Sequence, residues 1–383
     1  MDAERGFPKD EFRSRTARAQ ALMSNSDLTA ILLTTEADVR YYTGFLTRFW
    51  ESPTRPWFVV VPVAGDPIAV IPQIGRDLMA RTWVRDIRTW NAPDYSDDGV
   101  GLLADTLREV VPVGGKIGVP AHLESHVRMP LSDFNALQGS LNDRLVVSDR
   151  KITRSVRLIK SERELAKIKR AVGIADRAFA RVSDIAAPGV PLSAVFRNFQ
   201  RLCLEEGADW VPYLAGAAEE GGYGGVISPA DDTPLADRDL LMLDTGLVWD
   251  GYFCDFNRNY SLSPPTKAVS EAHTRLIEAT EAAFEIARPG QTVARLFHAM
   301  NAVLGLGEET GRLGHGLGMQ LTEAPSILPE DATVLEPGMV MTLEPYVKTG
   351  PGKIMVHEEN IVIGDKAAEY LTPPEGKELR VLC

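Results

Sequence analysis

The sequence predicts an α/β domain over residues 1–155, followed by an α+β domain over residues 156–383. In the first domain, short apolar segments alternate with helical segments, which is typical of a largely internal sheet covered by helices. The second domain opens with the strongest helical pattern in the chain, and short strands and turns dominate from Gly314 onward. A chain of 383 residues is long enough for both domains to bury a core.

The elements of the first domain are predicted from composition and from turn residues. Residues 11–25 have helix-forming composition, and residues 104–111 also have a helical pattern. Gly65 and Asp66 mark a turn between two apolar runs. The predicted strands comprise residues 28–33, 57–62, 67–72 and 116–119.

The second domain begins with a helical pattern over residues 156–182. Within it, Ser161 followed by Glu164 forms a capping box, which marks a helix start. The glycine-rich stretch over residues 216–225 is interpreted as a loop or hairpin. Further predicted helices comprise residues 192–206, 269–286 and 292–304, and predicted strands comprise residues 240–243, 340–343 and 360–363.

Charge and cysteine content exclude several classes of function. The formal net charge is −12, and Lys and Arg form no long basic run, so nucleic acid and anionic membranes are not expected partners. The three cysteines show neither a zinc-ribbon spacing nor a disulfide framework, which favours a reducing compartment. No apolar run is long enough to span a bilayer. We therefore expect a cytoplasmic protein.

Four carboxylates lie at the edges of apolar segments in the second domain. Asp244 and Glu344 each follow an apolar run, and Glu358 shortly precedes another. Asp255 comes eleven positions after Asp244, a spacing that suits two adjacent strands of a hairpin with both carboxylates on one face. Each residue alone fits a cap or a solvated strand end equally well, so the argument depends on the four together.

One of the six histidines joins this set. His315 is flanked by Gly314 and Gly316, which let the backbone approach a ligand closely and leave the ring accessible. Four carboxylates brought together would repel one another strongly unless cations balance them. A site rich in oxygen ligands with one imidazole suits Mn²⁺, Fe²⁺, Co²⁺ or Zn²⁺.

At this point the sequence resembles the pita-bread metallohydrolases of peptidase family M24, which include Xaa-Pro aminopeptidase, prolidase and creatinase-like enzymes. The resemblance covers the whole chain and implies a creatinase-like N-terminal domain and a pita-bread catalytic domain. The motifs that carry it are Tyr41-Tyr42-Thr43-Gly44-Phe45, Ile159-Lys160-Ser161-x-x-Glu164, Asp244-x10-Asp255, Gly314-His315-Gly316-x-Gly318, Thr342-x-Glu344-Pro345 and Glu358-Glu359-x-Ile361-Val362-Ile363.

The resemblance also implies roles for the five residues. Asp244 would bind one of two divalent metal ions, and Asp255 and Glu358 would bridge both. His315 and Glu344 would hold the second ion, and Glu344 would also accept a proton from the attacking water. Manganese is the first expectation for the metal, with iron, cobalt and zinc as alternatives.

The sequence departs from the family at the substrate side. The peptidases of this family usually carry two further histidines, one near Val226 or Ile227 here and one at the position of Thr322. Those histidines bind the scissile carbonyl oxygen and help to protonate the leaving group. Their absence removes oxyanion stabilisation of roughly 3 kcal/mol.

Other residues are candidate substrate contacts. His357 stands where an Arg is common in prolidases, Tyr346 lies in a shortened turn, and Thr322 replaces a histidine. Trp50 and Arg48 lie in a first-domain segment that, in this family, often reaches the active site of the partner subunit. For these two residues a packed domain interface is the alternative.

Together these features predict a dinuclear metal-dependent hydrolase that cleaves a peptide-like or small-molecule C–N bond, with Xaa-Pro peptidase as the first label. The expected partners are a dipeptide or small-molecule substrate and a second copy of the chain in a homodimer. The main alternative is a non-peptidase member that acts on a small metabolite, similar to ectoine hydrolase, creatinase or dimethylsulfoniopropionate lyase. A non-catalytic binding protein on the same fold ranks lower, because no metal ligand is lost.

Overall fold

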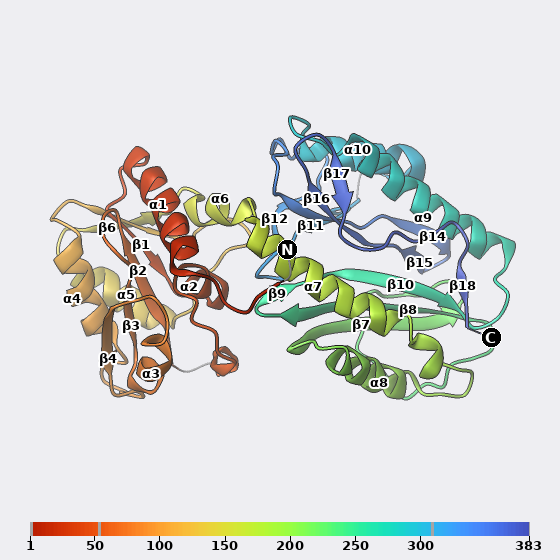
Figure 1. Ribbon diagram of the computed structural model, residues 1–383, viewed down its shortest axis with the longest axis horizontal. Coiled ribbons are helices and arrows are strands. Elements are labelled where there is room, and N and C mark those ends of the chain that lie inside the picture. The colour runs from red at the N-terminus through yellow and green to blue at the C-terminus, as the bar shows by residue number, and fades with distance from the viewer. Residues whose placement is uncertain (1–2, 53–54, 308–309, 383) are drawn as a thin grey trace. The chain divides into compact units, whose positions relative to one another are not determined.

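The computed structural model describes residues 3–52, 55–307 and 310–382. Its contacts divide the chain into two compact units, the first over residues 5–157 and the second beginning at Leu158 (Figure 1). Within the described ranges, no helix is both long enough and apolar enough to cross a membrane.

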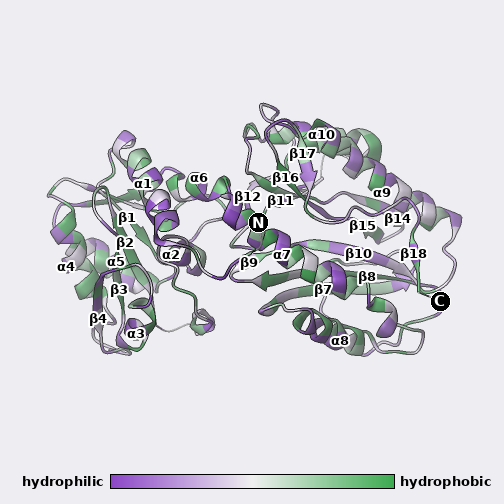
Figure 2. Cartoon of the chain, in the orientation of Figure 1, coloured by the Kyte–Doolittle hydropathy of each residue, from purple (hydrophilic) through white to green (hydrophobic). Residues whose placement is uncertain are grey.

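The first unit is built on a six-stranded sheet with the strand order β4-β3-β2-β1-β5-β6. The central strand β1 pairs with β2 in antiparallel and with β5 in parallel orientation, so the sheet is mixed. Its inner strands are hydrophobic along their length (Figure 2), because both faces of the sheet are covered. The strands are β1 (Ala30–Leu33), β2 (Phe58–Pro62), β3 (Ile68–Pro72), β4 (Asp86–Trp90), β5 (Lys116–Val119) and β6 (Leu145–Ser148).

Helices surround this sheet in the order that the alternating pattern predicts. The short helix after β1 begins where the Thr35 side chain accepts a hydrogen bond from the Asp38 amide, and it ends at Gly44 with φ of 78°. The helices are α1 (Lys9–Asn25), α2 (Glu36–Thr43), α3 (Arg76–Met79), α4 (Val100–Val110), α5 (Leu131–Ser140) and α6 (Ile152–Leu158).

The capping box at Ser161 is confirmed, but the helix predicted over residues 156–182 is wrong as a single element. The Glu164 amide donates to the Ser161 side chain, and the Glu164 carboxylate accepts from the Ser161 amide at 3.0 Å. The cap starts a new helix, so α6 ends at Leu158 and α7 runs from Glu162 to Phe179. Between them, Ile159 forms a β-bridge with Met339.

The second unit contains two five-stranded sheets and a two-stranded hairpin. The first sheet has the order β18-β10-β8-β7, with β9 paired to β8, and the second has the order β12-β11-β13-β16-β17. The strands of the first are β7 (Trp210–Glu220), β8 (Asp239–Trp249), β9 (Tyr252–Phe253), β10 (Phe256–Ser261) and β18 (Arg380–Val381). Those of the second are β11 (His315–Gly316), β12 (Glu323–Ser326), β13 (Val340–Leu343), β16 (Glu359–Ile363) and β17 (Ala368–Tyr370), and the hairpin is β14 (Tyr346–Gly350) with β15 (Lys353–Val356).

Two pairs of helices pack against these strands (Figure 1). Helices α7 and α8 contact the first sheet through β8 and β7, whereas α9 contacts the hairpin and packs against α10. The remaining helices of this unit are α8 (Leu192–Glu205), α9 (Lys267–Ile286) and α10 (Val293–Leu304).

The second sheet has one apolar face, which packs against the core, and one polar face, because side chains alternate along its strands. Met341 and Ile361 belong to the cluster of buried apolar residues that α9 and α10 complete. Because successive side chains along a strand point to opposite faces, Thr342 and Asn360 are directed away from that cluster. The carboxylates Glu344 and Glu358 continue the same parity and lie on this polar face.

One sequence expectation in the first sheet is wrong, and another is made more definite. Asp244 lies in the middle of β8, not at a strand end, because β8 has a neighbour on each side and its ladder continues to Trp249. The stretch over residues 216–225, interpreted as a loop or hairpin, is strand as far as Glu220 and pairs antiparallel with β8. Gly216 is required there by close packing, since a Cβ atom at this position would lie 2.4 Å from the Met242 carbonyl oxygen.

Candidate metal centre

Three of the five predicted residues form a compact buried cluster. Asp255, His315 and Glu358 each offer a ligand atom, and these atoms lie within 4.8 Å of one another. The closest measured approach joins His315 Nε2 to Asp255 Oδ2 at 3.4 Å. Asp255 comes directly before β10 and Glu358 directly before β16, so the cluster is held between the two sheets of the second unit.

Asp244 and Glu344 belong to the same group of residues, because their charges shift the pKa values of the neighbouring carboxylates. Burial and the charge of Glu344 raise the pKa of Asp244 to about 7, although a hydrogen bond from Tyr213 acts against this shift. Burial also raises the pKa of Glu358 well above its usual value, and the charges of Asp255, Glu344 and Asp244 add to that shift. All four carboxylates therefore act on one another within a single buried region.

His315 is oriented as a ligand by its own backbone. The ring is 3% exposed, and its Nδ1 atom lies 2.8 Å from the Gly316 carbonyl oxygen. A proton on Nδ1 satisfies this contact and leaves the Nε2 lone pair directed toward Asp255. Burial lowers the pKa of His315 to about 4, so the imidazole is neutral at pH 7, which is the form that binds metal.

The residues present fit a divalent metal pair. Asp244 Oδ1 and Glu358 Oε1 are buried and have no hydrogen-bond partner. Among the ion pairs of the described residues, none joins Asp244, Asp255 or Glu358 to a Lys or Arg side chain. Buried charges of this kind are otherwise paired or coordinate metals. Two divalent cations would balance the four negative charges, and one imidazole with several carboxylates is the donor set that manganese, iron, cobalt and zinc accept.

Sequence reasoning missed the residues that hold this cluster in place. Tyr213 on β7 donates a hydrogen bond to Asp244 Oδ2 at 3.0 Å. The Thr342 hydroxyl accepts from the His315 amide at 3.1 Å and also hydrogen-bonds Glu358. Such partners orient metal ligands and influence metal affinity. A Thr two positions before Glu344 was part of the recognised motif, but nothing in the sequence indicated the distant Tyr213.

His357 lies beside Glu358 in the link between β15 and β16. The side chain is buried, with Nε2 3.2 Å from Glu359 Oε1, and its ring packs near that of His273. These contacts connect His357 to Glu359 and α9. Its position gives no support to the expected substrate contact.

Behind the cluster, Arg258 anchors a buried ionic network. Its side chain is fully buried and contacts Glu359 at 3.1 Å and Glu375 at 3.0 Å, and it also donates to the Glu358 carbonyl oxygen. Burial alone would raise the pKa of Glu359, but Arg258 and the hydrogen bonds from His357 and Thr372 outweigh it and lower this pKa to about 2. The network therefore fixes the backbone that carries Glu358.

Replacing Arg258 with Met is expected to destabilise the protein by about 3–5 kcal/mol, because it leaves buried carboxylates without a counter-charge. Urea denaturation measures the change in the free energy of unfolding. Arg177→Met is the matched control, since its ion pair with Glu206 is 45% and 22% exposed and should contribute less than about 1 kcal/mol. Equal losses for the two variants would contradict a structural role for the Arg258 network.

The other expected substrate contacts lie in different surroundings. Tyr346 packs against the buried apolar cluster under α9 and lines a surface hollow of about 440 Å³ together with Arg275 and Lys348. Thr322 is half-buried and accepts a hydrogen bond from Arg312 at 3.4 Å. Burial raises the pKa of Glu344 and the charge of Arg312 opposes this shift, so Thr322 shares its surroundings with a cation that acts on the cluster.

In the first unit, Trp50 is 8% exposed and packs into a group of aromatic rings with Trp57. The Arg128 guanidinium lies over the Trp50 ring at 5.3 Å, which adds a cation–π contact. Arg48 is half exposed and forms an ion pair with Glu51. These contacts explain the packing of the segment, and a role of Trp50 or Arg48 toward substrate stays a prediction.

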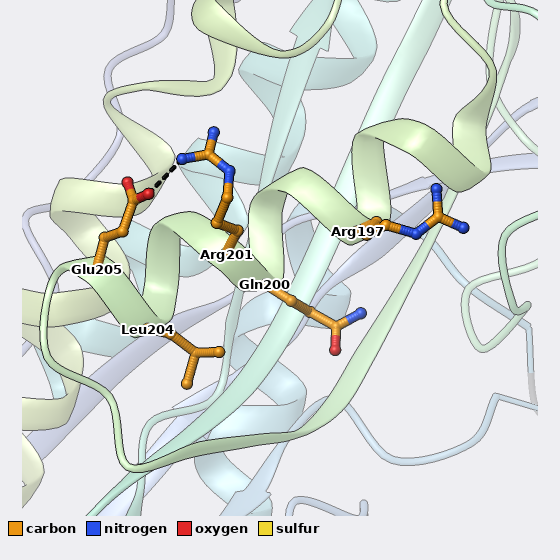
Figure 3. Close-up of a pocket in the computed structure, with 5 residues that line it drawn as sticks. All are labelled: Arg197, Gln200, Arg201, Leu204 and Glu205. Atoms are coloured by element: carbon orange, nitrogen blue, oxygen red, sulfur yellow. Dashed lines mark hydrogen bonds and ion pairs between the residues drawn. The ribbon is translucent and has the colours of Figure 1, made fainter.

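A second hollow, of about 490 Å³, lies on the surface of α8 (Figure 3). Its side chains include an ion pair between Arg201 and Glu205. None of the predicted site residues lines it. The residues drawn there are Arg197, Gln200, Arg201, Leu204 and Glu205.

A buried carboxylate and histidine cluster between two sheets, in a chain that also carries an α/β N-terminal unit, defines a metal-dependent hydrolase. Residues 166–365, more than half of the chain, match the model of metallopeptidase family M24, and residues 15–159 match the creatinase/prolidase N-terminal domain. The chain belongs to metallopeptidase family M24. It has the pita-bread fold and is a metallopeptidase-type hydrolase.

Several known proteins resemble the chain over almost its whole length. The probable dipeptidase PepE of Mycobacterium tuberculosis is 29% identical over 94% of this chain and 93% of its own. An Xaa-Pro dipeptidase of Lactobacillus delbrueckii subsp. lactis is 26% identical over 95% and 98%. The crystal structure of dipeptidase PepE from Mycobacterium ulcerans has a TM-score of 0.85 at 26% identity, covering 98% of this chain and 99% of that one. These relatives favour the peptidase prediction over the non-peptidase alternatives.

Proposed function

We propose that this chain is a dipeptidase whose five convergent side chains hold two divalent cations, with Xaa-Pro dipeptides as its first substrate class. The observation that carries the proposal is the buried cluster of Asp255, His315 and Glu358, in which one Glu358 oxygen has no hydrogen-bond partner. The names of the similar proteins, dipeptidase and Xaa-Pro dipeptidase, support the substrate class.

In this proposal Asp244 holds one ion, Asp255 and Glu358 lie between both, and His315 and Glu344 hold the other. When bound, the ions supply Lewis acidity toward the scissile carbonyl and activate water for attack. Glu344 is the only one of the four carboxylates that is not fully buried, and burial raises its pKa. We therefore assign proton acceptance from the attacking water to Glu344, and the neutral Nε2 atom of His315 acts only as a ligand.

The metal, assembly and location are parts of the same proposal. Manganese is proposed because hard oxygen ligands with a single imidazole suit it, with iron, cobalt or zinc as alternatives. A homodimer is proposed from the family resemblance, and light scattering of the purified protein tests it. A cytoplasmic location is supported by Cys203 and Cys254, which are buried and unpaired.

A substrate panel tests the proposed activity. The Mn²⁺-loaded protein should hydrolyse dipeptides and should act best on Xaa-Pro among them, as measured by release of free amino acids. Proline-free dipeptides, tripeptides and small nitrogenous osmolytes complete the panel. Protein that binds metal yet hydrolyses no dipeptide would refute the dipeptidase proposal, and osmolyte turnover would then identify a non-peptidase member of the family.

A further inference from the structure

The two strands that carry the proposed bridging carboxylates begin with the same pattern, an acid followed two positions later by Asn. Asp255 and Asn257 occur at the start of β10, and Glu358 and Asn360 occur at the start of β16. The two strands belong to different sheets, so nothing in either sheet ladder fixes their separation directly. Side chains must join them.

The two asparagines join the strands reciprocally. Asn257 Oδ1 accepts a hydrogen bond from the Glu358 amide at 3.0 Å. In return, Asn360 Oδ1 accepts from the Asp255 amide at 3.1 Å, and Asn360 Nδ2 donates to the Asp255 carbonyl oxygen. Each asparagine thus holds the backbone of the acid on the opposite strand. We call this pair of side chains the asparagine latch.

The position of the latch connects it to the remaining ligands. Asn257 is the direct β-partner of Asp244 across β8 and β10, so both side chains share one face of the first sheet. Asn360 is the direct partner of Thr342, whose hydroxyl holds the His315 amide. Both asparagines are buried, with 1% and 0% exposure, so water does not replace these contacts.

We infer that Asn257 and Asn360 are positioning residues that set the separation between Asp255 and Glu358, and that the latch thereby controls metal affinity. The inference rests on the proposed dinuclear centre and deepens it. A neutral amide suits this position because it accepts and donates hydrogen bonds without adding charge. Neither amide carries an ionisable group, so the latch adds no negative charge beside four carboxylates.

Asn259 provides a matched control within the same strand. Its amide is also buried in β10, and it donates to the Val356 carbonyl oxygen at 2.7 Å and accepts from the Tyr223 hydroxyl at 3.0 Å. It therefore joins β10 to the end of β15 and to Tyr223 without contacting the backbone of a proposed ligand. Loss of Asn259 removes equivalent buried hydrogen bonds and leaves the latch intact.

The experiment measures Mn²⁺ affinity by calorimetric titration of metal-depleted protein, with thermal unfolding of the same samples recorded in parallel. Asn257→Ala and Asn360→Ala should each weaken binding by about tenfold or more, the usual effect of losing an outer-shell partner. Asn259→Ala should lower the unfolding temperature by a similar amount while keeping affinity within about threefold. Asn257→Thr keeps an acceptor oxygen on a residue type that suits strands, and should recover most of the affinity.

The outcomes separate the latch from the metal centre. Wild-type protein that binds no Mn²⁺ would refute the dinuclear proposal and the latch with it. Wild-type binding together with equal losses of affinity in Asn257→Ala and Asn259→Ala would refute the latch alone. If Asn257→Ala fails to fold, Asn360→Ala carries the same comparison against Asn259→Ala, and wild-type affinity in Asn360→Ala would overturn the inference.

Discussion

Replacement of Asp255 by Asn is expected to lower kcat/KM for the best dipeptide substrate by at least about a thousandfold, which corresponds to about 4 kcal/mol of transition-state stabilisation. The amide keeps the shape of the carboxylate but removes the negative charge that we place between both cations. Asp255 is also the carboxylate that contacts His315 Nε2. Its loss should therefore weaken binding of both proposed ions, the one assigned to Asp244 and the one assigned to His315 and Glu344. Metal content should fall from two ions per chain to one or none.

Activity assays and elemental analysis of the purified variant check this expectation. Asp239→Asn is a suitable control, because Asp239 is a buried carboxylate at the start of β8, the neighbour of β10 in the same sheet, and accepts a hydrogen bond from the Ala236 amide. It lies away from the cluster and should keep activity within a few-fold. An Asp255→Asn protein that retains two ions and wild-type turnover would show that Asp255 does not bridge the ions.

Removal of metal is expected to lower the unfolding temperature by about 8 °C or more at pH 8. A ligand present at about a thousand times its dissociation constant stabilises the folded state by about 4 kcal/mol, and each kcal/mol shifts the unfolding temperature by about 2–4 °C in a domain the size of the second unit, which contains the site. Calorimetry of chelated and Mn²⁺-saturated samples measures the difference. Identical curves would mean that the folded chain binds no metal under these conditions.

The metal-free protein should also become less stable as pH rises from 6.5 to 8. Burial and mutual repulsion raise the folded-state pKa of Asp244 to about 7 and those of Asp255 and Glu358 well above their usual values. The folded state therefore retains protons that the unfolded chain has released, and its stability falls with rising pH up to those folded-state pKa values. Below pH 6.5, His315 and His273 act in the opposite direction, because burial lowers both pKa values to about 4.

Thermal unfolding across pH 6.5–8 tests the sign of this effect. Bound cations replace the protons on the carboxylates, so the metal-loaded protein should show a smaller slope. Metal-free Asp255→Asn should also show a smaller slope, because one of the repelling charges is gone. A metal-free wild-type protein that gains stability over this range would contradict the assignment of raised pKa values to the cluster.

The sequence predicted that a strand is present more reliably than it predicted where that strand ends. The apolar runs at residues 340–343 and 116–119 correspond to β13 and β5 with the same bounds. For β8, the apolar run ended at Leu243 while the strand continues through Asp244 to Trp249. Pairing with β7 and β10 extends a strand through polar residues, and such partners cannot be seen in a local pattern.

The same limit applies to the site. Of the five predicted ligands, Asp255, His315 and Glu358 come together at strands that belong to the two sheets of the second unit, and the family motifs located those strands. His357 is one residue from Glu358, yet its ring contacts Glu359 and packs near His273, and no local sequence pattern indicates these contacts. The asparagine latch had a visible signal, the acid-x-Asn pattern repeated at Asp255 and Glu358, but its meaning required knowledge that the two strands are neighbours across sheets.

The contacts of the C-terminal segment with Arg258 and β10 have a consequence for when the metal site forms during synthesis of the chain. All five proposed ligands have been synthesised once Glu358 is added, but Glu375 contacts Arg258 only later, and β18 then pairs Arg380 with Tyr260 on β10. A nascent chain that stops shortly after Glu358 therefore contains every proposed ligand but lacks Glu375, the second carboxylate that contacts Arg258 in the complete chain. Metal capture should be a late event in biosynthesis, after the segment from Thr372 to Val381 has emerged from the exit tunnel and closed over β10.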